Sequence, residues 1–244
     1  MEPLGDRMKR YEAAASPVLP WRLPVVVRVD GKAFHTWTRG LERPWSAAFS
    51  TAMDSAALLL CKEMQGARLA FVQSDEISVL LWPWRTVESM PWFDNQLSKI
   101  VSVAAGLASA EMTLCSELVH GGPRRAVFDA RAFAIPESDV ANYFVWRQQD
   151  AERNSLLGLT QAHYSHREMH GAKKAQMHDL LHAKGVNWND LPTEQKRGRC
   201  IRRSGANDME DWIVDREIPI FTQAREYIEG HLWRETKQEA EVRA

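Results

Sequence analysis

Residues 71–81, FVQSDEISVLL, contain two apolar runs separated by the polar tetrad QSDE. Short runs rich in β-branched and aromatic residues are typical of strands, and polar residues between two such runs are typical of a turn. We therefore predict strands at 68–72 and 77–82, joined by a hairpin turn or a bulge. Two neighbouring acids, Asp75 and Glu76, lie in this connection, and their charges are costly in an apolar segment unless something compensates them.

The segments on either side of the hairpin predict the fold class. In chain order they are a strand at 25–29, a helix at 46–64, the hairpin, a helix at 95–118 and a strand at 125–135. Asp30-Gly31 ends the first strand, and Ser46 is the expected N-cap of the first helix. The order β-α-β-β-α-β predicts an α+β, ferredoxin-like fold, in which the first and third strands are neighbours in the middle of the sheet.

The second half of the chain predicts a mostly helical extension. Helices are expected at 138–157, 163–182 and 220–239, with the basic cluster KRGRCIRR at 196–203 between the last two. We expect residues 137–244 to pack on a core formed by residues 1–136, which begins with a lead-in helix at 1–15. No long linker separates the two parts.

The composition is that of an ordinary globular protein, with 244 residues, 45% apolar residues and a net charge of −1. Its three cysteines are far apart and form no CxxC motif, which argues against a disulfide framework and a zinc knuckle. The N-terminus lacks an apolar signal segment, and the longest apolar run, IVSVAAGLASA, is too short to span a bilayer. We expect a cytoplasmic protein without a membrane partner. Hydrolase, NTPase and dehydrogenase functions lack support because no nucleophile elbow, P-loop or GxGxxG motif is present.

The predicted topology brings acids from two distant segments toward one point. Asp30 closes the first strand, while Asp75 and Glu76 lie at the turn that leads into the third. Carboxylate oxygens are the ligands of hard divalent cations, and two Mg²⁺ ions about 4 Å apart serve phosphoryl and nucleotidyl transfer. Successive strand residues point to opposite faces, so we predict Asp75 as the ligand and Glu76 as its support.

The glycine after Asp30 adds to this hypothesis. Gly31 has no side chain, so its carbonyl and a triphosphate can approach closely, and the backbone of GKAFH can form a nest for phosphates. Lys32 adds positive charge there. The alternative is structural, since an Asp-Gly pair is commonly a plain turn and two acids are commonly a solvated hairpin tip.

Several motifs together resemble one known family. RVDGKAFHTWTRG, VQSDEISVLL, FDAR and WRQQDAERNSL, spread over about residues 5–200, closely resemble the tRNA(His) guanylyltransferase family in its bacterial, archaeal and phage-like branch. The resemblance implies a polymerase-palm fold and two Mg²⁺ ions. It also implies that a nucleotide, typically G, is added in the 3′–5′ direction to the 5′ end of tRNA(His) or another, possibly truncated, tRNA. In the family, ATP or GTP activates the 5′ end, and the 3′-OH of an incoming nucleotide then displaces pyrophosphate.

The resemblance and the local charge assign roles to individual residues. The expected metal ligands are Asp30, Gly31 through its carbonyl, and Asp75, with Glu76 as the second acid of the SDE motif. The expected GTP and ATP contacts are Asp30, Gly31, Lys32, Ala33, Phe34, His35, Arg43, Ser74, Asp75 and Lys99. The expected RNA contacts are Arg147, Asn154, Lys173, Lys174, Lys196 and Arg197.

Four positions depart from the family pattern. Glu152 replaces a histidine tied to reading the tRNA(His) anticodon, Ser46 replaces an acid, and Asn95 and Gln96 replace two arginines. The RNA substrate and the preferred nucleotide therefore stay open.

Two other functions also stay open, namely a palm-type nucleotide cyclase or dinucleotide synthase and a non-catalytic RNA-binding module. We expect a homo-oligomer, a dimer or a tetramer, with tryptophans between residues 82 and 92 at an interface.

Overall fold

The sheet has the predicted central order. The structure, a computed structural model, describes residues 2–84, 88–205 and 211–232. Its strands form one antiparallel sheet in the order β4-β1-β3-β2-β5-β6. The strand bounds are β1 Val25–Gly31, β2 Ala67–Gln73, β3 Glu76–Leu81, β4 Phe128–Ala134, β5 Arg199–Arg203 and β6 Trp212–Asp215. The first and third strands are neighbours, as the ferredoxin-like prediction requires.

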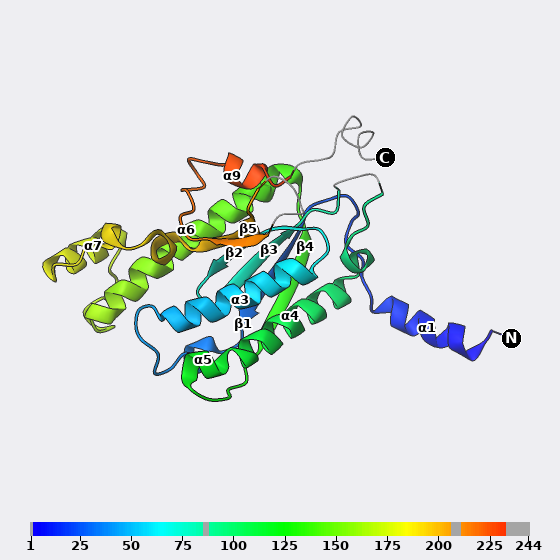
Figure 1. Cartoon of the computed structure of the whole chain (residues 1–244), viewed down its shortest axis with the longest axis horizontal. Coiled ribbons are helices and arrows are strands. Elements are labelled where there is room, and N and C mark those ends of the chain that lie inside the picture. Colours follow the sequence, from blue (N-terminus) through cyan, green and yellow to red (C-terminus); the bar gives the residue numbers. More distant parts are fainter. Residues whose placement is uncertain (1, 85–87, 206–210, 233–244) are drawn as a thin grey trace.

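Helices cover both faces of this sheet (Figure 1). One face carries α3 (Ala47–Glu63) and α4 (Leu97–Leu114), and the other carries α6 (Glu137–His163). The shorter helices are α1 Leu4–Ala14, α2 Phe34–Trp37, α5 Ser116–His120, α7 Lys174–Ala183, α8 Thr193–Arg197, α9 Glu226–Glu229 and the 3₁₀ turns η1 Trp92–Asn95 and η2 Trp188–Asp190. The predicted lead-in helix is α1, which buries no residue and projects from the body of the molecule.

The alternation along β3 decides which side chains face which helices. Ile77, Val79 and Leu81 belong to the core cluster under α3 and α4, whereas Leu80 packs with residues of α6. Successive strand residues point to opposite faces, so Glu76 lies on the α6 side with Leu80. Glu76 is therefore on the same face of the sheet as the residues of α6.

Helix boundaries were predicted less well. The expected helix at 95–118 is divided at Cys115 into α4 and α5, while the helix at 138–157 extends to His163. The expected helix at 163–182 is wrong over its first half, because only α7 is helical there. The expected terminal helix at 220–239 is reduced to α9, and its end lies outside the described residues.

The C-terminal half also contributes strands that were not predicted. Part of the basic cluster at 196–203 is β5, which pairs with β2 and carries β6 at the edge of the sheet. The sheet therefore continues from the residues of the predicted core into those of the extension. The division at residue 136 stays a prediction.

Two other expectations need correction. Trp82 and Trp92 were expected at an exposed interface, but both side chains are buried within the chain. The apolar run expected to be too short for a membrane belongs to α4, which by length and hydropathy alone would suffice to cross one. One side of α4 packs in the core through Ile100, Ala104 and Met112, as a helix of a globular domain does.

Candidate active site

The strand register brings Asp30 to the hairpin that carries Asp75. Asp30 is the cross-strand partner of Glu76, and the N–H of Gly31 donates to the carbonyl of Asp75 at 3.1 Å. Ser74, with a φ of 46°, makes the tight turn, and its hydroxyl donates to the Asp75 carboxylate at 2.9 Å. Burial raises the pKa of Asp75, the nearby Asp30 carboxylate adds to this, and Ser74 and His35 oppose it.

This pair has the chemistry of a divalent cation site. Two carboxylates close enough to repel each other are stabilised when a cation lies between them. Among the residues that the structure describes, no cluster of three or more His, Cys, Asp or Glu side chains is suited to a metal. Two carboxylates with several open positions suit a hard ion such as Mg²⁺, which retains waters and binds substrate phosphates. Zinc, which prefers closed sites of nitrogen and sulfur ligands, fits less well.

Close contacts around position 31 require a glycine there. A Cβ at this position would lie 2.6 Å from Cγ of Phe34 and 2.9 Å from Oδ2 of Asp75. Phe34 cannot retreat, because its buried ring is stacked on Trp37 and packed against Phe128, with centroids 5.1 and 4.8 Å away. The Asp75 carboxylate therefore lies directly over the backbone of Gly31.

We expect Gly31→Ala to destabilise the fold by about 1–3 kcal/mol, the usual cost of overpacking, and to displace Asp75. Urea unfolding and nucleotide addition measure the two effects. Gly106→Ala is the matched control, because a Cβ there meets nothing within 4 Å and alanine favours the helix by up to about 1 kcal/mol. Equal stability of the two variants would contradict the expectation.

In the segment after Gly31, only some of the side chains are accessible to a ligand. Ala33 has a left-handed conformation, with a φ of 57°, and begins α2. Lys32 and His35 are exposed, and His35 is near enough to affect the pKa of Asp75. The expected contact of Phe34 with a nucleotide is limited to its backbone, because its ring belongs to the core.

Glu76 and Arg147 form a buried ion pair. Nε and Nη2 of Arg147 donate to the two oxygens of Glu76 at 2.8 and 3.0 Å, and Nη2 also donates to Asp150 at 2.7 Å. Burial raises the pKa of Glu76, and Arg147 and then Arg28 oppose this shift. Arg147 was expected to contact RNA, but α6 places its guanidinium under the sheet, where it is buried and engaged by the carboxylates of Glu76 and Asp150. Glu76 is placed as a support behind the Asp75 turn.

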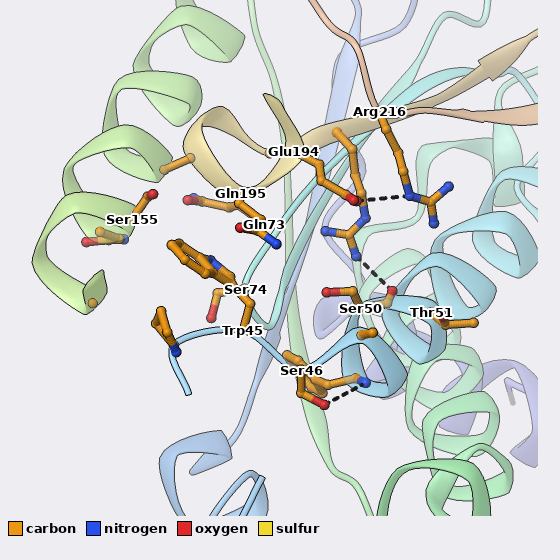
Figure 2. A pocket seen from close by; sticks show the side chains of 18 of the residues that line it. Trp45, Ser46, Ser50, Thr51, Gln73, Ser74, Ser155, Glu194, Gln195 and Arg216 are labelled. Atoms are coloured by element: carbon orange, nitrogen blue, oxygen red, sulfur yellow. Dashed lines mark hydrogen bonds and ion pairs between the residues drawn. The ribbon is translucent and has the colours of Figure 1, made fainter. Parts of the chain in front are cut away.

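A cavity of about 550 Å³ opens beside the turn, and Figure 2 shows its walls. Ser74 and Gln73 come from the hairpin, Trp45 from the loop before α3, and Ser155 from α6. The start of α3 contributes Ser50 and Thr51, and a further wall comes from α8 and the segments beside it, through Glu194, Gln195, Gly198, Arg199 and Arg216. Sequence reasoning missed Trp45, Gln195 and Arg216, because no local pattern connects them to the acids.

An ionic network holds the far wall of the cavity. Asp54 of α3 is buried and pairs with both Arg199 and Arg216, and Arg216 pairs in turn with Glu194 at 2.9 Å. The basic cluster at 196–203, which contains two of the expected RNA contacts, is thus largely engaged inside the protein. Arg202 likewise pairs with a carboxylate, that of Asp215, at 2.7 Å.

Two expected RNA contacts of this cluster are also engaged. Arg197 pairs with Glu152 at 3.9 Å, and the amine of Lys196 donates to the carbonyl of Asn189 at 2.7 Å. Glu152, which departs from the family pattern, therefore has a structural partner. Asn95, another departure, is buried and donates to the carbonyl of Pro20 at 3.0 Å.

The remaining predicted residues are exposed but dispersed. Asn154 lines the cavity, and Arg43 lies between two residues that line it. Lys173 and Lys174 are exposed at the start of α7, at the end of the molecule away from α1 (Figure 1).

Lys99 is not brought to the acids. It lies ten residues, or about 15 Å along α4, before Ser109. Ser109 is the residue of α4 that lies at the level of the acids, because its hydroxyl accepts from the N–H of Phe128, the cross-strand partner of Gly31. Lys99 is therefore far from Asp30 and Asp75.

A palm-like antiparallel sheet with a carboxylate pair at the ends of its central strands defines the class of this protein, a nucleotidyltransferase. The chain belongs to the tRNAHis guanylyltransferase family, whose sequence model matches residues 5–136. A bacterial tRNA(His) guanylyltransferase-like protein solved in complex with ATP is 41% identical, with a TM-score of 0.90 over 95% of this chain and all of the other. A similar bacterial protein in complex with GTP is 38% identical, with a TM-score of 0.81 and the same coverage. The tRNA(His) guanylyltransferase of Schizosaccharomyces pombe is 28% identical over 79% of this chain and 77% of its own length. These findings confirm the family resemblance and the fold class.

Proposed function

We propose that this nucleotidyltransferase adds a nucleotide to the 5′ end of a tRNA in the 3′–5′ direction and depends on Mg²⁺. The observation that carries the proposal is the Asp30–Asp75 pair over the backbone of Gly31. Bound there, Mg²⁺ would orient the attacking 3′-hydroxyl and neutralise charge on the reacting phosphates. Asp30, Asp75 and the carbonyl of Gly31 are the groups that would hold it.

The residues around the pair support binding of a triphosphate. Lys32 and His35 are exposed on the segment that follows Asp30, and Lys32 supplies positive charge where a leaving group develops negative charge. The N–H groups of Gly31 and Lys32 are bonded to the carbonyls of Asp75 and Val127, so the backbone N–H groups offered to phosphates begin at Ala33, the N-cap of α2. Ser74 has its hydroxyl at the same turn.

The cavity beside Ser74 supports binding of the nucleoside part. Its volume of about 550 Å³ is within the range of small-ligand sites. Trp45 offers a flat ring, and Asn154 and Gln195 offer amide groups that both donate and accept hydrogen bonds. The ATP and GTP complexes of the two bacterial proteins support ATP and GTP as the nucleotides of this chain.

A labelling experiment tests the proposal. The protein is incubated with Mg²⁺, radiolabelled GTP, unlabelled ATP and tRNAs that lack their first 5′ nucleotides, and labelled RNA is separated from small products. We expect label at the 5′ end of the RNA, lost when Mg²⁺ is chelated and lost with Asp30→Asn. A set of tRNAs with different 5′ ends, including tRNA(His), identifies the preferred substrate.

The same gel distinguishes the other functions. Labelled cyclic or dinucleotide products formed without RNA would instead indicate a cyclase or dinucleotide synthase. RNA binding without any labelled product would indicate a non-catalytic module and would overturn the proposal.

A further inference from the structure

A second depression lies on the other side of the carboxylate pair. It has a volume of about 480 Å³ and is lined by Lys32, Ala33, Thr36, Trp37, Arg39 and Arg124. The first cavity extends from Ser74 of the hairpin to Arg199 of β5, whereas this depression is lined by Lys32 after β1 and Arg124 before β4, and β4 and β5 lie on opposite sides of the central strands β1 and β3. The two hollows therefore flank the same pair of acids.

The depression carries uncompensated positive charge. Lys32, Arg39 and Arg124 are exposed, and within the described part of the chain none of them forms an ion pair with a carboxylate. The arginines around the first cavity differ, because Arg199 and Arg216 are both paired with Asp54. No acid lines the depression, so an anion is its natural ligand.

The backbone and one hydrogen bond hold these cations in place. The N–H of Lys32 donates to the carbonyl of Val127 at 2.8 Å, which joins the segment before α2 to the loop before β4. Nη1 of Arg124 donates to the carbonyl of Trp37 at 2.7 Å. Arg124 keeps its other N–H groups for a ligand, and Arg39 has its whole guanidinium free of internal hydrogen bonds among the described residues.

We propose that this depression binds a backbone phosphate of the RNA strand, just beyond the 5′ end that reacts at Asp30 and Asp75. The inference rests on the proposed function, because a nucleotidyl transfer needs two reactants at one pair of acids. The first cavity has room for one nucleotide, so the polyanionic second reactant approaches from the opposite side. Beside Lys32, which this depression shares with the proposed triphosphate site, the donors are Thr36, Arg39 and Arg124, and such groups position a strand without reading its sequence.

The phosphates of a free nucleoside triphosphate have the same chemistry, so the experiment measures both ligands. Arg39→Glu is compared with wild type and Arg39→Lys in two titrations. One uses a 3′-labelled tRNA that lacks its first nucleotide and carries a 5′-triphosphate, at several KCl concentrations. The other uses ATP with Mg²⁺ alone. Lys62→Glu is the control, because Lys62 is also exposed but lies in the last turn of α3, whereas Trp37 of the depression packs on Phe49 in the first turn of that helix.

We expect Arg39→Glu to weaken RNA binding about tenfold and to reduce the slope of log K against log [KCl] by about 1. ATP binding is expected to change by less than about twofold, Arg39→Lys to retain most RNA affinity, and Lys62→Glu to resemble wild type. Circular dichroism confirms that Arg39→Glu is folded.

Three results would overturn the inference. They are an unchanged RNA affinity and salt slope, an equal loss with Lys62→Glu, and a selective loss of ATP binding, which would assign the depression to a free triphosphate. Failure of the wild type to bind or extend RNA would overturn the proposed function as well, whereas normal wild-type activity with any of the three results overturns only the phosphate site.

Discussion

Asp75→Asn is expected to reduce the rate of nucleotide addition by at least about 1,000-fold, which corresponds to about 4 kcal/mol of transition-state stabilisation. The side chain keeps its shape but loses the charge that holds the cation beside Asp30. Single-turnover addition of labelled nucleotide to a 5′-truncated tRNA measures the effect. Asp94→Asn is the control, because Asp94 is exposed in η1 and asparagine tolerates its φ of 52°. A loss of less than tenfold would remove Asp75 from the site.

The same variant is expected to be more stable than wild type without metal. The pKa of Asp75 is raised in the folded protein, first by burial. A group with a raised pKa contributes stability below its unfolded pKa and loses that contribution as the pH rises through its folded pKa. Above its raised pKa, the ionised Asp75 therefore costs stability, and Asp75→Asn removes that cost.

Thermal unfolding across pH measures this cost. The wild-type melting temperature should fall more steeply than that of Asp75→Asn as the pH rises through the raised pKa. Added Mg²⁺ should raise the melting temperature of wild type, because ligands that bind the folded state stabilise it, and should have little effect on the variant. An equal response of both proteins would contradict a cation site at Asp75.

The largest expected effect on stability comes from Arg147→Met. The side chains of Arg147 and Glu76 are only 5% and 11% exposed, so removing Arg147 leaves the buried Glu76 carboxylate with Arg28, at the longer distance of 4.0 Å, as its remaining ion-pair partner among the described residues. We expect a loss of about 3–5 kcal/mol in the free energy of unfolding, measured with urea. Removing both charges in Glu76→Gln, Arg147→Met should cost less than the sum of the single changes.

A surface arginine on the same helix provides the control. Arg153 also pairs with Asp150, but its side chain is 73% exposed, and exposed pairs contribute less than about 1 kcal/mol. Arg153→Met should therefore be nearly neutral. A similar cost for Arg153→Met and Arg147→Met would show that burial of the Glu76 pair is not what stabilises the hairpin.

Local patterns sufficed for the centre of the fold. The apolar runs around QSDE and the valines before Asp30 indicated β3, β2 and β1, because strand formation depends on residue type and period over a few positions. The order of elements then placed β1 beside β3. Antiparallel pairing brought the end of one to the start of the other, so the meeting of Asp30 and Asp75 was predictable.

Long-range charge pairing was not predictable in this way. Arg147 was predicted to contact RNA because the sequence shows the cation but not its ion-pair partner. That partner, Glu76, lies 71 residues away. Arg199 read as part of a basic patch, but its partner Asp54 is 145 residues distant. Lys99 matched a family motif, yet the direction of α4 places it far from the acids.

The sequence by itself therefore determined the four strands β1 to β4, the pairing of β1 with β3 and the two carboxylates, since these follow from short-range periodicity and one rule of topology. Only the tertiary structure decided that Glu76 supports the FVQSDEISVLL hairpin through Arg147, and that α8 closes the cavity through Arg216. The physical reason is that burial and ion pairing depend on which distant segments share a face of the sheet. Residue type and spacing alone do not reveal which distant segments share a face.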